Sequence, residues 1–203
     1  MKLVSWGGYI MAIFEHGIAQ LAINEKATIA STTGDTSFLS AGSVLPDTPY
    51  MLTDSFGTQW PESVIQTPYA IYGVDTVAKK IWRIALTGTL NRRYTVTTIS
   101  DFKVQKFLND NISLGEHETT PIIGIRNVKS HYNAFKNEVM FTFYDDLNAA
   151  EEKVWNLCYN ETLDKFTTFY SWVPSYSANI DNIFFTFDRD TSKRIAKKSI
   201  KDN

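Results

Sequence analysis

The chain has 203 residues, of which 43% are hydrophobic and 14% aromatic, and its formal net charge at pH 7 is −2. This length suffices for one large core or two small ones, and so many aromatic rings favour β-sheets over helices. The near-neutral charge excludes the broad basic surface with which proteins bind nucleic acid or anionic membranes. The single cysteine, Cys158, excludes a disulfide framework and a cysteine-rich zinc site, and its apolar flanks predict a buried, unreactive thiol.

The N-terminal segment, residues 1–61, is predicted to form a β-hairpin followed by a long loop. Residues 6–14 are apolar, but Glu15 and His16 end this run before it is long enough to span a bilayer. The run also lacks the charged start and the cleavage site of a signal peptide. Residues 30–49 are rich in Ser, Thr, Gly, Asp and Pro, which predicts a surface loop, and loops of this length often serve in binding.

Residues 62–120 are predicted to form a four-stranded sheet and one short helix. The helix is expected at 101–112, where Ser100 or Asp101 can act as N-cap and the apolar side chains recur at helical spacing. The strand-like runs that precede it are separated by turn-prone residues and lie at 63–66, 70–74, 80–85 and 94–99.

Residues 121–175 repeat this pattern and are predicted to form a second four-stranded sheet. The last part, 176–203, is expected to hold a partial strand at 183–187 and a basic tail. The excess of Lys and Arg at 189–201 has two interpretations: a contact with nucleic acid, or a solvated helix or a strand severed from its partner. The strand-like runs of the second sheet lie at 122–131, 138–144, 153–159 and 165–172.

Three turns share one pattern, and each begins with a residue that suits a tight corner: Asp75, Asn133 or Asn160. Asp and Asn side chains hydrogen-bond the backbone two residues further on and tolerate a left-handed backbone. We therefore predict these three residues as structural turn positions. Any β-hairpin protein has such turns, but two successive four-stranded meanders also resemble the blades of a β-propeller. Two blades cannot close a propeller, so the chain is expected to be a fragment of a longer protein or to pack against other subunits.

Five stretches of the sequence resemble one known protein family. Matching stretches lie at 6–23, 52–60, 71–83, 123–143 and 159–174, in the same order as in the family. Together they resemble the tail-associated structural proteins of crAss-like and related Bacteroidetes phages, in particular the muzzle that closes the tail, which is similar in role to the nozzle of short-tailed phages. These relatives are much longer than the present chain.

The resemblance implies a virion protein with a propeller-like fold that forms part of a ring around the DNA-exit channel. Its implied partners are other copies of itself and neighbouring phage tail proteins, with incidental contact to exiting DNA and no membrane. Its implied location is the phage tail, after synthesis in the cytoplasm of the host bacterium. The resemblance carries over no catalytic residue, no metal ligand and no cofactor.

An enzymatic site is not predicted. The three histidines, His16, His117 and His131, lie far apart without metal-ligand spacing, and the sequence has neither a phosphate-binding loop nor a nucleophile elbow. The carboxylates of Asp47, Asp54 and Asp75 leave a polysaccharide-degrading fragment open as an alternative. However, Asp54 and Asp75 stand beside turn residues, where a structural role is the default. A calcium site remains conceivable at the acidic segment of Asp145, Asp146, Asn148 and Glu151, which lacks the spacing of an EF-hand.

A binding module is the main alternative to a structural protein. A carbohydrate- or protein-binding β-module, for a phage receptor or a host surface, would use exposed aromatic rings as platforms. The sequence offers Trp60, Tyr72 and Trp172 for this role. Trp82 and Phe141, by contrast, are expected to lie buried in the cores of the two sheets.

Overall fold

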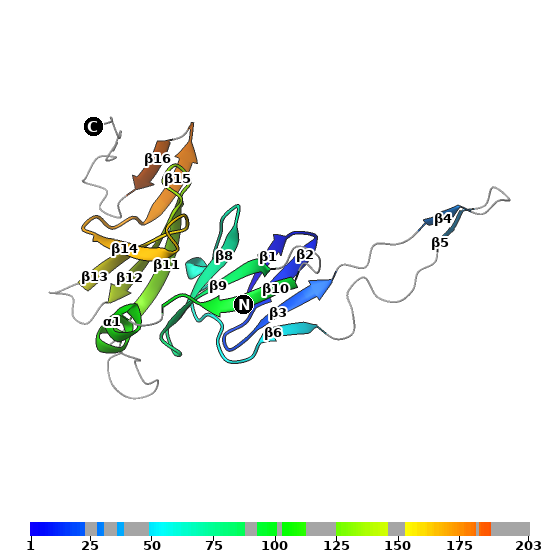
Figure 1. Ribbon diagram of the computed structural model, residues 1–203, viewed down its shortest axis with the longest axis horizontal. Coiled ribbons are helices and arrows are strands. Elements are labelled where there is room, and N and C mark those ends of the chain that lie inside the picture. Colours follow the sequence, from blue (N-terminus) through cyan, green and yellow to red (C-terminus); the bar gives the residue numbers. More distant parts are fainter. Residues whose placement is uncertain are drawn as a thin grey trace. The chain divides into compact units, whose positions relative to one another are not determined.

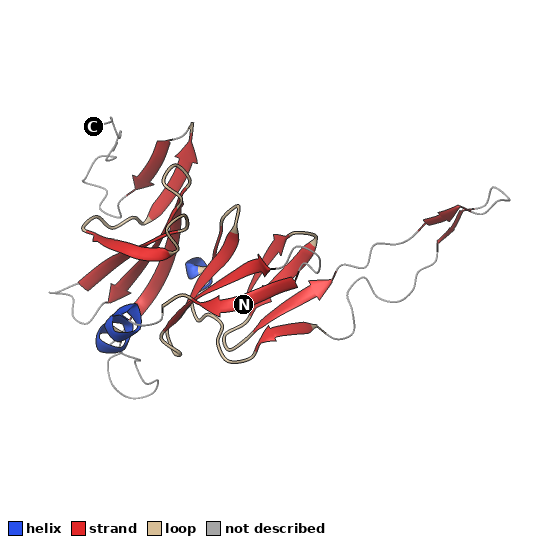
Figure 2. Cartoon of the chain, viewed as in Figure 1, coloured by secondary structure: helices blue, strands red, loops and turns tan. Residues whose placement is uncertain are grey.

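The structure is a computed structural model that describes residues 1–22, 28–30, 36–38, 49–87, 93–100, 103–112, 125–145, 153–181 and 183–187. The chain forms two compact units, Met1–Gly57 and Thr58–Asn203. Figure 2 shows that nearly all regular structure is β-strand. The predicted class is confirmed, because the described chain consists mainly of antiparallel sheets, three of them four-stranded, with one short α-helix. The division into the four predicted parts stays a prediction.

The first unit holds a four-stranded antiparallel sheet where the sequence predicted a hairpin and a loop. Gly7 and Gly8, with φ of 60° and 83°, make the tight turn between the first two strands, a conformation that glycine adopts without cost. Two further strands complete the sheet, and a separate small hairpin lies between them in the sequence. The sheet consists of β1 (Lys2–Trp6), β2 (Tyr9–Ile13), β3 (Ile18–Ala22) and β6 (Tyr50–Thr53), and the hairpin of β4 (Thr28–Ala30) and β5 (Thr36–Phe38).

The second unit begins with the sheet predicted for the segment after residue 62 (Figure 1). Its first strand is shorter than predicted, because Pro61–Ser63 forms the 3₁₀ turn η1, which proline favours at its start. The other three strands lie where the alternation placed them, with ends shifted by a few residues. In sequence order the strands are β7 (Ile65–Gln66), β8 (Ala70–Asp75), β9 (Lys80–Thr87) and β10 (Arg93–Thr98).

A second meander follows, and a terminal hairpin packs beside it. The sequence placed a strand at 183–187 but missed its partner at 176–180. Asn179 fixes this hairpin to the sheet, since its Nδ2 donates to the Tyr132 carbonyl at 2.8 Å and its Oδ1 accepts from the Ala134 N–H at 3.1 Å. The meander consists of β11 (Ile125–Asn133), β12 (Glu138–Asp145), β13 (Lys153–Asn160) and β14 (Lys165–Tyr170), and the hairpin of β15 (Tyr176–Ile180) and β16 (Ile183–Phe187).

One hydrophobic core joins the two sheets of the second unit with the helix α1 (Lys103–Asn111). The Tyr72 ring of β8 lies 6.5 Å from the Phe141 ring and 5.7 Å from the Tyr159 ring, centroid to centroid. Leu108 of the helix is fully buried in the same cluster. The helix lies in the predicted segment, and no helix in the described part of the chain is long and apolar enough to cross a membrane.

The three recurring turns have one geometry. Each turn spans four residues between paired strand ends, and the residue just before the returning strand has a left-handed backbone. These residues are Lys79, Asn137 and Asp164, with φ of 54°, 52° and 51°. In each turn the side-chain oxygen of the first residue accepts backbone N–H groups: Asp75 from Ala78, Asn133 from Phe135 and Lys136, and Asn160 from Leu163, over 2.8–3.3 Å.

Removal of one of these oxygens tests the role proposed for the turn positions. Asn133→Ala is expected to lower the free energy of unfolding by about 1 kcal/mol, because two backbone N–H groups lose their acceptor. Lys136→Ala in the same turn serves as the control, since its exposed side chain makes none of these bonds. Urea denaturation of both variants gives the comparison, and equal stability would remove the role proposed for Asn133.

Candidate functional site

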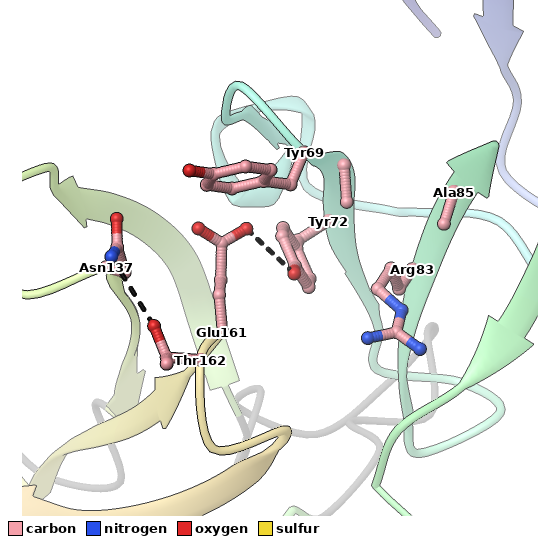
Figure 3. Close-up of a pocket in the computed structure, with 8 residues that line it drawn as sticks. Tyr69, Tyr72, Arg83, Ala85, Asn137, Glu161 and Thr162 are labelled. Atoms are coloured by element: carbon pink, nitrogen blue, oxygen red, sulfur yellow. Dashed lines mark hydrogen bonds between the residues drawn. The ribbon is translucent and has the colours of Figure 1, made fainter.

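Polar side chains gather where the two sheets of the second unit meet, around the turn between β13 and β14. Glu161, in that turn, accepts hydrogen bonds on Oε1 from the Thr67 hydroxyl at 2.7 Å and from the Tyr72 hydroxyl at 2.9 Å. Figure 3 shows the bond from Tyr72. Burial, and after it the Glu161 carboxylate, raise the pKa of Tyr72, so its hydroxyl stays protonated and donates. The carboxylate thus holds one sheet against the other.

A second set of bonds crosses the same junction. Arg83 of β9 donates from Nη1 to the Tyr159 hydroxyl at 3.1 Å and to Asp164 Oδ1 at 2.7 Å, and Tyr159 also donates to Asp164. The hydrogen bonds from Tyr159 and from Arg83 lower the pKa of the Asp164 carboxyl. Because the Asp164 side chain is 68% exposed, water screens the Arg83–Asp164 ion pair. The pair therefore adds little to stability and mainly fixes the orientation of one sheet against the other.

A cavity of about 310 Å³ opens beside these bonds. Its floor is formed by two small side chains that face each other across the strands, Ala70 of β8 and Ala85 of β9. We call this space the inter-sheet notch. It is lined by Tyr69, Ala70, Tyr72, Arg83, Ala85, Asn137, Glu161 and Thr162 (Figure 3).

Comparison with known proteins assigns the chain to a family. The sequence profile of the Crassvirus muzzle protein family matches residues 1–190. The chain belongs to this family. The muzzle protein of Bacteroides phage crAss001 is 22% identical to it over 196 residues, which cover 92% of the present chain and 12% of that protein. The chain therefore spans less than an eighth of that relative's length, and the predicted resemblance to phage muzzle proteins is confirmed.

The three rings predicted as exposed platforms differ in exposure: Tyr72 is buried, whereas Trp60 and Trp172 are partly exposed. For Tyr72 the prediction is wrong, because its ring is buried between the two sheets. Trp60 is partly buried against the core and donates from Nε1 to the Thr76 hydroxyl at 3.2 Å. The Trp172 ring lies 5.1 Å from the Tyr170 ring and 6.2 Å from the Phe184 ring, centroid to centroid.

In its described part, neither unit holds two of the three carboxylates considered for catalysis. Asp54 and Asp75 belong to different units, and Asp75 is buried and accepts the Ala78 N–H. Asp47 and the acidic segment from Asp146 to Glu151 lie outside the described residues. Within the described ranges, no three His, Cys, Asp or Glu side chains are close enough to hold a metal ion. Burial raises the pKa of the Cys158 thiol to about 12, as expected for the inert thiol that was predicted.

The sequence did not predict the polar bonds that join the two sheets of the second unit. These bonds involve Thr67, Tyr72, Arg83, Tyr159, Glu161 and Asp164. Glu161 and Asp164 stand inside a turn that the sequence singled out, but their partners come from a distant sheet. Arg83 was a possible signal, because a charged residue interrupts an apolar strand and such a residue needs a partner when its neighbours are buried.

His131 joins the terminal hairpin to the second sheet. Its Nδ1 lies 3.0 Å from the Ser177 hydroxyl of β15. Burial lowers the pKa of His131 to about 4, and the nearby Lys129 ammonium acts in the same direction, whereas Glu62 and the Pro174 carbonyl oppose it.

The lowered pKa predicts a loss of stability in acid. In the unfolded chain His131 takes up its proton near its ordinary pKa of 6.5, whereas in the folded chain it does so only near 4. Stability from this group is therefore complete above pH 6.5 and lost as the pH falls toward 4, by up to roughly 3 kcal/mol. Denaturation curves at pH 7 and at pH 4.5 should show a smaller difference for His131→Gln than for the unmodified chain. Equal pH dependence in the two would contradict the buried, neutral histidine.

Proposed function

We propose that the chain is a structural component of a crAss-like phage virion, a segment of a muzzle-type tail protein. Membership of the Crassvirus muzzle family supports this assignment. We further propose that its sheets are blade-like modules in a ring around the DNA-exit channel. The partners are then other copies of the same protein and neighbouring tail proteins, with incidental contact to exiting DNA.

One structural observation supports this proposal independently of the family assignment. Two successive four-stranded meanders share one core, and polar bonds from Glu161 and Arg83 fix one meander against the other. Such a junction suits a rigid building block, because directional bonds and a shared core together hold one arrangement. A scaffold of this kind needs no reactive group, in keeping with the proposal that the chain is not an enzyme.

Mass spectrometry of purified virions tests the assignment. Peptides of this chain should accompany the virions through a density gradient, and their ratio to the portal protein should be the same in every preparation. The protein is made in the host cytoplasm under this proposal, so infected cells should contain it before virions form. Recovery from infected cells but not from washed virions would refute the structural role. A ratio that varies between preparations would refute the ring.

A further inference from the structure

The inter-sheet notch lies where the large side chains along β8 and β9 give way to two alanines. Across β8 and β9, Tyr72 pairs with Arg83, and two pairs further along, on the same face of the sheet, Ala70 pairs with Ala85. The change from a tyrosine–arginine pair to an alanine pair leaves the space of about 310 Å³. This volume lies at the lower end of the range for small-molecule sites, which corresponds to one compact ring rather than an extended ligand.

The walls of the notch combine an aromatic face with hydrogen-bonding groups of both kinds. Tyr69 is 65% exposed and lies next to Glu161 in the close-up view (Figure 3). Arg83 supplies donors and Glu161 an acceptor, and the Asn137 amide, which accepts from the Tyr132 hydroxyl and donates to the Thr162 hydroxyl, borders the same space. The charges of Arg83 and Glu161 are opposite, so the notch favours a neutral ligand over an ion.

These polar groups are held in place before any ligand enters. Glu161 is fixed by Thr67 and Tyr72, and Arg83 by Tyr159 and Asp164. Preorganised groups cost little ordering entropy on binding.

We propose that the inter-sheet notch binds one neutral sugar ring of a glycan. The Tyr69 face packs against the C–H groups of the ring, and the polar walls bond its hydroxyls, which both donate and accept. The small floor of Ala70 and Ala85 admits the ring. The proposal goes beyond the structural role and does not depend on it, since a sugar contact neither requires nor excludes ring assembly.

NMR titration of the chain with methyl glycosides of galactose, mannose and N-acetylglucosamine tests the proposal. At least one of the three is expected to give saturable shifts with a dissociation constant in the millimolar range, as suits a single shallow site. Tyr69→Ala should weaken this binding by about tenfold or more, which corresponds to the loss of one stacking contact. Ala85→Phe should abolish it, because the new ring fills the notch.

Tyr50→Ala is the matched control, because Tyr50 is also 65% exposed but belongs to the first unit. It should bind the sugar as the unmodified chain does. Thermal melts of all three variants identify any loss of fold, and Glu161→Gln provides a second probe of the notch if Ala85→Phe melts early. The proposal is overturned if none of the three glycosides gives saturable shifts. It is also overturned if Tyr69→Ala binds as well as Tyr50→Ala does.

Discussion

Replacement of Phe141 by alanine is expected to lower the free energy of unfolding of the second unit by about 3–5 kcal/mol. The Phe141 ring is fully buried in β12, where it lies 6.5 Å from Tyr72 of the other sheet and 6.4 Å from Phe166. Its loss leaves a cavity in the core that the two sheets share, and the removed ring also gives up its transfer free energy from water.

The control for Phe141 is another phenylalanine of the same sheet region. Phe135 stands in the turn between β11 and β12 and is 59% exposed, so Phe135→Ala should change the unfolding free energy by no more than roughly 0.5 kcal/mol. Guanidinium denaturation followed by near-ultraviolet circular dichroism reports the packing of the aromatic core. A stability loss that is equal in the two variants would refute the shared core.

Trp82→Ala is expected to cost a similar amount, about 3–5 kcal/mol. Its ring is fully buried and lies directly over Gly73, its partner across β8 and β9. A Cβ atom at Gly73 would come within 2.2 Å of the Trp82 Cζ2 atom, so only glycine leaves room for the ring there. Gly73 is therefore needed to make room for the Trp82 ring, and not to form a turn.

A double-mutant cycle separates this contact from simple burial. Gly73→Ala alone should be strongly destabilising, since the ring must leave its position. In the Trp82→Ala background the same change should be neutral or slightly stabilising, because alanine suits a strand interior better than glycine does. Urea denaturation of the four proteins provides the coupling energy. Additive effects of the two substitutions would show that the ring does not lie on Gly73.

The sequence predicted the local part of this fold well. The strands of both meanders in the second unit follow from alternation over a few residues and from turn residues such as Asn133 and Asn160, and neighbouring strands are close in sequence. The sequence did not reveal β6 or β15. The short β6 pairs with β3 across a long intervening segment, and nothing local indicates such a pairing.

The junction between the sheets was less predictable for a related reason. Thr67 and Glu161 are 94 residues apart, so no spacing rule connects them. The alternation in β8 shows that Tyr72 and Ala70 share a face, but both faces of this strand are buried. Alternation therefore could not show that Tyr72, predicted as an exposed platform, is buried, whereas Tyr69, just before the strand, is exposed.

Cryo-electron microscopy of the intact virion tests the central claim, that the chain is a structural part of the phage tail, most directly. The account predicts density for the two packed four-stranded sheets in the tail, repeated by rotational symmetry about the axis of the DNA-exit channel. Phe141 and Glu161 should lie inside each repeat, at the contact between its sheets. A tail map resolved well enough to trace every chain, without these sheets in it, would contradict the account.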